Sequence, residues 1–256
     1  MVRGDLIIAT IGVACVLGGC ARTVVVPPSW SSVPNGEAMA DAYPGFASWI
    51  DVSGWAQLRC RSDLLGNLAE CRAVKADPAG LGFDRAALSL TPRFKLNPLQ
   101  RDGEVGKSSV EFTVRFLLPP EESIVPWAGP EPSEEVMALA QVAASRIVES
   151  GDDTATGILS DLDVDADRVA VVTRMVERLS ADYAARRIES TALMLARSAN
   201  LTQLRALSEG RRPPGPIPSQ ATVEAAGPEL EALQREFAAE LRGVYCARFA
   251  CSPPSS

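Results

Sequence analysis

The sequence predicts an α+β protein in which a small β-rich domain precedes a separate all-α domain. Residues 110–116 alternate apolar and polar side chains, which is typical of a half-buried β-strand. From Ser133 onward, apolar residues instead recur every three or four positions, as they do on the buried face of an α-helix. A proline-rich stretch separates the two patterns, so we expect two domains joined by a linker.

These patterns divide the 256-residue chain into six segments. They are a signal peptide over 1–19, a tether over 20–48, the β-rich domain over 49–118, a linker over 119–132, the helical domain over 133–251 and a tail over 252–256. The tether is rich in proline, glycine and serine, so we expect an extended segment with little core of its own.

The first twenty residues predict export and lipid attachment. Residues 6–18 are apolar or small and would span about 20 Å as a helix, against about 30 Å of bilayer hydrocarbon. This length favours a signal peptide over a membrane-spanning helix. The run ends in Leu17-Gly18-Gly19-Cys20, which resembles the lipobox of bacterial lipoproteins and implies an acylated Cys20. Ala21 after this cysteine resembles the sorting signal for the outer membrane; the alternative is an ordinary secretory signal that leaves a soluble periplasmic protein.

Four cysteines remain once Cys15 leaves with the leader and Cys20 carries the lipid. An even number of cysteines in an exported chain is typical of disulfides. Of the three possible connectivities, proximity favours local pairs: Cys60 with Cys71, and Cys246 with Cys251. A zinc site made of the four thiolates is the alternative, but the spacing lacks a Cys-x₂-Cys motif.

The first cysteine pair also predicts a β-hairpin. If Cys60 faces Cys71, then Leu65-Gly66 forms a two-residue turn with the glycine at a position of positive φ. A short helix over 83–90 and a turn at Asp102-Gly103 follow the hairpin.

The order of these elements resembles the C-terminal domain of TonB-family proteins. The matching residues are Tyr43-Pro44, Gly54, Gly66, Gly82-Phe83-x-x-Ala86-Ala87-Leu88, Arg93-Phe94-Lys95-x-x-Pro98, Asp102-Gly103 and the closing strand with Val110, Phe112, Val114 and Phe116. The resemblance covers residues 43–118. It implies a three-stranded antiparallel sheet with one or two helices, whose last strand is an edge to which a partner protein adds a strand. The alternative is an edge that is capped or paired with a second copy of the chain.

The helical domain shows clear start signals. Ser133 followed by two glutamates predicts a helix N-terminus, and a long helix is expected from Asp165. Its predicted core stripe is Val169, Val172, Val176, Leu179 and Tyr183. A shorter helix over 201–207 and a last helix, kinked or restarted at Pro228, complete the domain. The element Leu-Thr-x-x-Leu-Arg-Ala-Leu resembles an uncharacterised family of helical domains in exported bacterial proteins, and this resemblance implies no activity.

Composition argues against several classes of function. The chain has no histidine, which removes the Ser-His-Asp triad and every His-ligated metal site. The acidic run from Asp161 to Asp167 lacks the glycine and glutamate of an EF-hand, because Ala166 and Val172 occupy those positions. The net charge of −7 disfavours binding to nucleic acid. We therefore expect no cofactor, metal or small-molecule substrate.

The favoured function is a non-catalytic, lipid-anchored envelope protein that binds another envelope protein. The alternative is a TonB-type energy transducer for outer-membrane transport with an uncleaved N-terminal anchor. The missing histidine, the lipobox and the short tether all depart from the transducer pattern. An enzyme is the least favoured class, since no nucleophile and base can be paired from the sequence.

Overall fold

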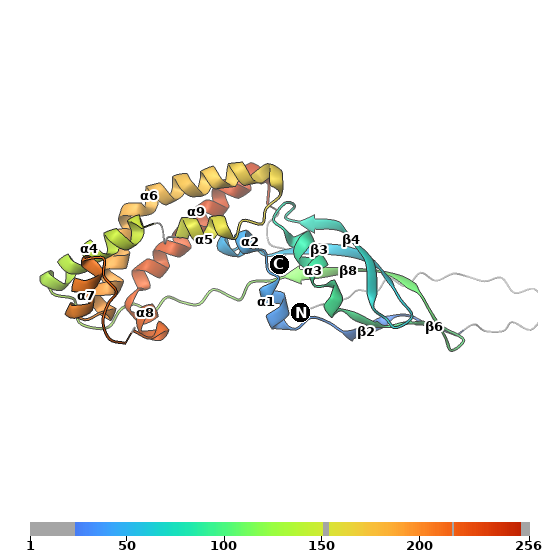
Figure 1. Cartoon of the computed structure of the whole chain (residues 1–256). Helices are drawn as coiled ribbons and strands as arrows, with labels where there is room; N and C mark the ends of the chain where they lie inside the picture. The colour runs from blue at the N-terminus through green and yellow to red at the C-terminus, as the bar shows by residue number, and fades with distance from the viewer. Residues whose placement is uncertain (1–23, 151–153, 217, 252–256) are drawn as a thin grey trace, which may run out of the picture. The chain divides into compact units, whose positions relative to one another are not determined.

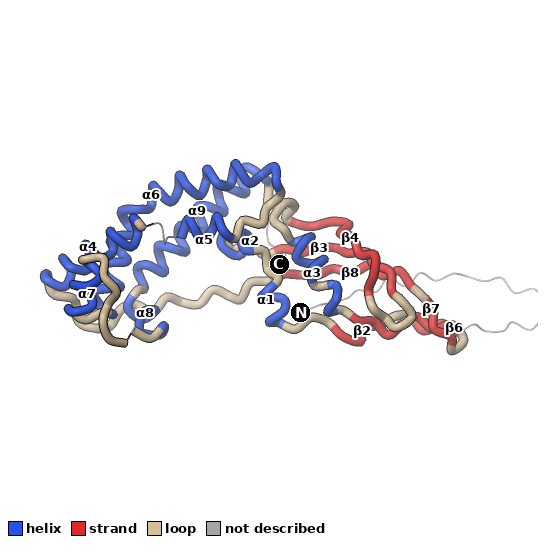
Figure 2. Tube along the Cα trace, in the orientation of Figure 1, coloured by secondary structure: helices blue, strands red, loops and turns tan. Residues whose placement is uncertain are grey.

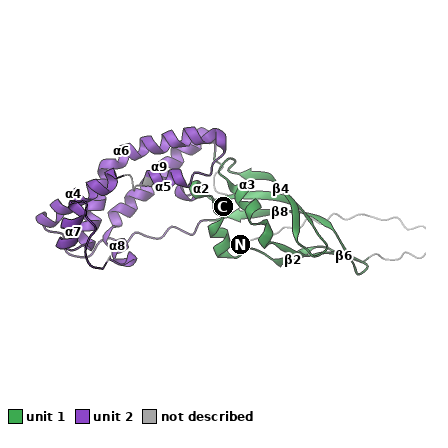
Figure 3. Ribbon diagram, viewed as in Figure 1, with its two compact units in different colours: residues 1–47, 53–117, 251–256 green, residues 48–52, 118–250 purple. Residues whose placement is uncertain are grey.

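The computed structural model describes residues 24–150, 154–216 and 218–251 and shows an α+β chain (Figure 1). The strands belong to small antiparallel sheets, and the C-terminal region is helical (Figure 2). The described residues form two compact units (Figure 3). The first contains residues 24–47, 53–117 and 251, and the second contains residues 48–52, 118–150, 154–216 and 218–250. The leader with Cys20 and the tail 252–256 lie outside the described residues. None of the helices described is long and apolar enough to cross a bilayer.

A three-stranded antiparallel sheet forms the framework of the first unit. Its strands are β3 (Gly54–Ser62), β4 (Leu68–Asp77) and β8 (Ser108–Phe116), in the order β4-β3-β8. Even-numbered residues of β3 are buried and odd-numbered ones face outward, as period-two alternation requires. Helix α3 (Phe83–Ser89) packs against β3 and β4. This helix confirms the expected helix over 83–90 to within one residue.

An aromatic cluster fills the space under the helix. Phe83 lies 5.6 Å from Phe116 and 5.9 Å from Tyr43, measured between ring centroids. Gly54, opposite Phe116 on β3, leaves room for this cluster, because a Cβ atom there would lie 2.3 Å from Phe83. The sheet and the helix therefore meet at a position that only glycine fits.

The hairpin between β3 and β4 differs from the prediction in its loop. Gly66 has the expected positive φ of 82°, but the loop has three residues, because Asp63 and Asn67 close it by a backbone hydrogen bond of 3.0 Å. The Asp63 carboxylate accepts the N–H groups of Leu65 and Asn67, both at 2.8 Å, which stabilises the longer loop. A bulge with Glu70 at φ 49° then restores the register.

The segment expected to be an extended tether over 20–48 is folded from Val25 onward, so that prediction is wrong for the described residues. It contains β1 (Val25–Val26), β2 (Ser29–Ser32), α1 (Gly36–Asp41) and α2 (Gly45–Trp49). Strand β2 pairs with β5 (Lys95–Asn97), and β1 pairs with β6 (Leu99–Arg101), which in turn pairs with β7 (Glu104–Gly106). The physical reason is burial: Phe46 and Ala47 are fully buried, and Trp30 packs on Phe94 and Phe112.

The second unit contains six helices in the described residues. They are α4 (Glu134–Glu149), α5 (Thr154–Ser160), α6 (Ala166–Ser198), α7 (Leu201–Ser208), α8 (Gln220–Ala226) and α9 (Pro228–Phe249). The predicted cap at Ser133 is confirmed, since its hydroxyl accepts the N–H of Val136. The start at Asp165 and the restart at Pro228 are confirmed as well.

Helix α6 is the centre of this unit and packs against α4 and α9 (Figure 1). Four of the five predicted stripe residues are buried, while Val169 is exposed. Tyr183 on α6 meets Phe237 on α9 edge-to-face at 5.3 Å, and the α4 contact uses small residues such as Ala140 and Ala144. Burial and the nearby carboxylates of α9 raise the pKa of the Tyr183 phenol.

Candidate functional site

Strand β8 lies at one edge of the three-stranded sheet. It pairs with β3 through nine consecutive residues, from Gly54 opposite Phe116 to Ser62 opposite Ser108, without a bulge. Among the described residues no other strand pairs with β8. One side of the strand therefore offers backbone N–H and C=O groups without a β partner.

The direction of these backbone groups follows from two hydrogen bonds at the start of β8. The N–H of Ser108 donates to Ser62 Oγ at 3.2 Å, so the backbone of Ser108 faces β3. The hydroxyl of Ser109 donates to the Cys60 carbonyl at 3.4 Å, so the backbone of Cys60, opposite Val110, faces β8. Because backbone groups alternate in direction along a strand, the even-numbered residues of β8 bond to β3. The odd-numbered residues present their N–H and C=O groups to the free side: Ser109, Glu111, Thr113 and Arg115.

The four residues predicted for this edge point into the unit instead. Val114 and Phe116 are buried, and Val110 is half-buried. Phe112 packs 4.9 Å from Trp30 and 5.1 Å from Phe94. Their side chains fix the inner face of β8, and the surface at the free side comes from the residues between them. The polar residues of the alternating pattern, which lie between the four predicted ones, would have indicated this surface.

The outward side chains leave the free side of β8 accessible. Arg59 on β3 holds the Glu111 carboxylate with an Nη2–Oε2 distance of 2.6 Å, and Gln57 donates to its other oxygen at 2.7 Å. These bonds draw the Glu111 side chain over β3. Both charges are exposed, so the pair contributes little to stability, and its effect is to orient the side chain.

The opposite edge of the sheet is less suited to pairing. Strand β4 is bulged twice against β3, and Glu70 adopts a left-handed conformation. Bulges interrupt the regular row of donors and acceptors that an added strand needs. Strand β8 has neither a bulge nor a proline over its nine residues. The geometry therefore favours β8 over β4 as a binding edge.

The disulfides expected from the sequence are present. Cys60 and Cys71 are bonded with an S–S distance of 2.04 Å, and Cys246 and Cys251 form the second pair. The Cys60–Cys71 bond joins β4 to β3 at Cys60, which pairs with Val110 of β8 on its other side. It stabilises the central strand to which β8 is paired.

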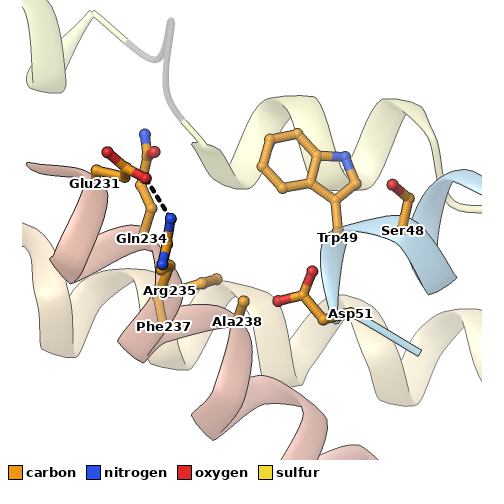
Figure 4. A pocket seen from close by; sticks show the side chains of 8 residues that line it. All are labelled: Ser48, Trp49, Asp51, Glu231, Gln234, Arg235, Phe237 and Ala238. Carbon is orange, nitrogen blue, oxygen red and sulfur yellow. Dashed lines mark hydrogen bonds and ion pairs between the residues drawn. The ribbon is translucent and has the colours of Figure 1, made fainter. Parts of the chain in front are cut away.

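The helical unit has a hollow of about 410 Å³ (Figure 4). Figure 4 shows Glu231 and Arg235 on one side, joined by an ion pair of 2.5 Å, and Trp49 and Asp51 on the other. Arg235 also pairs with Glu121 at 3.1 Å, so its charge is already neutralised. Among the residues that line the hollow, no nucleophile is hydrogen-bonded to a base, and it carries no argument for catalysis.

A second arrangement in this unit was not foreseen from the sequence. The Arg197 guanidinium lies 5.2 Å from the centroid of Trp127 and donates to Glu229 at 2.6 Å. The Arg197 side chain is only 4 % exposed, and its hydrogen bond lowers the pKa of Glu229. Trp127 belongs to the proline-rich stretch after β8, so this contact holds that stretch against α6.

Metal binding finds no support in the described parts of the chain, where no group of three or more Cys, Asp or Glu side chains could hold an ion. Comparison with family models and with curated proteins gives no match for this chain.

Proposed function

We propose that this protein is a non-catalytic, lipid-anchored lipoprotein of the bacterial cell envelope that binds a partner protein by strand addition at β8. The observation that carries the proposal is the free side of β8. This strand has nine residues without bulge or proline, and within the described parts of the chain it pairs only with β3. Main-chain hydrogen bonds along the free side of β8 would supply the affinity.

The order of elements in the first unit supports the resemblance to the TonB-family C-terminal domain. A hairpin is followed by a helix and then by a closing strand, and that strand lies at an edge next to the first strand of the hairpin. This is where the resemblance expects a partner's strand. Force transduction is not part of the proposal, because the chain lacks a histidine and carries a lipobox ending in Cys20.

The strand-addition step is tested with a proline at Thr113. The N–H of Thr113 points to the free side, so Thr113→Pro removes one outward donor and leaves the pairing with β3 intact. Thr113→Val is the matched control, because it keeps the N–H and suits a strand. Far-UV circular dichroism checks that both variants are folded.

The readout is photocrosslinking in intact envelopes, with a benzophenone amino acid in place of Arg115. We expect an adduct with another envelope protein that persists with Thr113→Val and falls at least fivefold with Thr113→Pro, since a lost hydrogen bond of about 1 kcal/mol corresponds to a factor of about five. An adduct with the mass of two copies of the chain, an adduct insensitive to Thr113→Pro, or no adduct would each overturn the proposal.

Lipid anchoring is tested by mass spectrometry of the mature N-terminus. A diacylglyceryl Cys20 is the expected result. An intact leader beginning at Met1 would contradict the lipoprotein and favour the transducer.

A further inference from the structure

The small sheet β1-β6-β7 presents three exposed valines on one face. Val26 pairs with Gln100, and Gln100 pairs on its other side with Val105, so these side chains share a face. Val24 precedes Val26 by two residues and joins the same face. The exposed fractions of the three valines are 61 % for Val24, 48 % for Val26 and 45 % for Val105.

The other face of this sheet is charged. Val25 pairs with Arg101, and Arg101 pairs with Glu104, all of them exposed. The sheet is thus two-sided. One face carries three valines around Gln100, with the Asp102 carboxylate beside Val24 bound to a backbone N–H, and the other carries Val25 together with an arginine and a glutamate. Exposed apolar side chains collected on one face of a small sheet indicate contact with another apolar surface.

The position of β1 in the chain identifies that surface. Only four residue steps separate Cys20 from Val24, and an extended chain spans at most about 3.6 Å per residue, or about 14 Å in total. Val24 is fixed to the ribbon, because its N–H donates to the Asp102 carboxylate at 2.8 Å and its carbonyl accepts the Asp102 N–H at 2.9 Å. Acyl chains on Cys20 would therefore hold Val24, and with it the valine face, within about 14 Å of the lipid-anchored cysteine.

We infer that the face formed by Val24, Val26 and Val105 docks on the bilayer surface, which orients the first unit on the membrane. The inference rests on the proposed acylation of Cys20. The apolar faces of amphipathic helices bury about 5–10 Å into the boundary between headgroups and acyl chains, and the valine face would insert there in the same way. Arg101 and Glu104, on the opposite face, stay in water.

The test compares neighbouring residues on opposite faces. The full acylated protein is reconstituted in vesicles of phosphatidylethanolamine and phosphatidylglycerol that contain doxyl-labelled lipid, with a fluorescent amino acid in place of either Val105 or Glu104. Because only one face reaches the interface, we expect quenching by the doxyl lipid to be about fivefold stronger at position 105 than at position 104. The same probe at Val26 provides a second reading should the Val105 variant fold poorly.

Equal quenching at positions 105 and 104, or protection of position 105 from an aqueous quencher without quenching by lipid, would overturn the inference. The second outcome would mean that a protein or a second copy covers the valines. Failure of the proposed function is distinguishable, because mass spectrometry of the native protein would then show Cys20 without acyl groups, whereas the quenching experiment compares two positions of the acylated protein.

Discussion

Replacing Glu229 with glutamine removes the ionic partner of a buried arginine in the helical unit. The Arg197 side chain is 4 % exposed, and its Nη1 donates to Glu229 at 2.6 Å and to the carbonyl of Ala226 at 3.3 Å. Its Nε has no hydrogen-bond partner. After Glu229→Gln, the guanidinium keeps the Ala226 carbonyl, a neutral amide and the face of Trp127.

The size of the effect follows from this geometry. Breaking a buried ion pair by removing one partner costs about 3–5 kcal/mol. Here the Glu229 side chain is 42 % exposed, so solvent screens the pair, and glutamine still accepts a hydrogen bond. We therefore expect the free energy of unfolding of the helical unit to fall by about 2 kcal/mol.

Urea unfolding followed by far-UV circular dichroism measures this change, because the six helices of the unit dominate the signal. The control is Glu135→Gln, whose pair with Arg205 is exposed on both sides and should cost less than about 1 kcal/mol. The double variant Arg197→Met/Glu229→Gln should regain at least half of the loss, since it removes the buried charge. A Glu229→Gln variant no less stable than Glu135→Gln would refute the reasoning.

The same pair predicts a pH dependence. The hydrogen bond from Arg197 lowers the pKa of Glu229 from its ordinary value of 4.5. A lowered pKa in the folded state means that the stabilisation is complete above pH 4.5 and is lost as the pH falls through the lowered value. The difference in stability between the wild type and Glu229→Gln should thus shrink on acidification below pH 4.5, as urea unfolding across a pH series would show.

Two further predictions concern the first unit. Gly66→Ala should destabilise it by about 1–3 kcal/mol more than Gly103→Ala. Both glycines have positive φ, but only a Cβ atom at position 66 would meet the Leu96 carbonyl oxygen, at 1.8 Å. Equal shifts in thermal unfolding for the two variants would contradict this steric explanation. Cys60→Ala/Cys71→Ala should lower the free energy of unfolding by about 2–3 kcal/mol, since the bond closes a short loop, and unchanged thermal unfolding would show that the sheet does not need it.

Local signals in the sequence were sufficient for the starts of α4, α6 and α9. Ser133 marks a helix start because its hydroxyl accepts a nearby N–H, Asp165 occupies the N-cap position, and Pro228 suits the first turn because it has no N–H to leave unpaired. The stripe on α6 indicated its buried face because the apolar residues recur at helical spacing, although Val169 is exposed.

Where distant contacts decide, the sequence was a poorer guide. The segment over 20–48 has the composition of a tether, yet Phe46 and Trp30 find partners elsewhere in the first unit and fold it. The hairpin loop has three residues rather than two because the Asp63 carboxylate binds two N–H groups and a bulge at Glu70 absorbs the shift. Secondary-structure propensity is judged over a short stretch of sequence, so it does not include contacts between residues that are distant along the chain.

By itself, the sequence predicted the α+β class and the alternation of β8 and favoured the local pairing of the cysteines, since each depends on spacing along the chain. Only the tertiary structure decided that β8 is a regular edge next to β3, with the backbone N–H and C=O groups of Thr113 and Arg115 on its free side. It also decided that Arg197 contacts Trp127, which lies 70 residues earlier in the chain. The physical reason is that strand order and buried ion pairs are set by which surfaces meet after folding. Periodicity indicates which side of a strand is buried, whereas the neighbour of that strand depends on the whole fold.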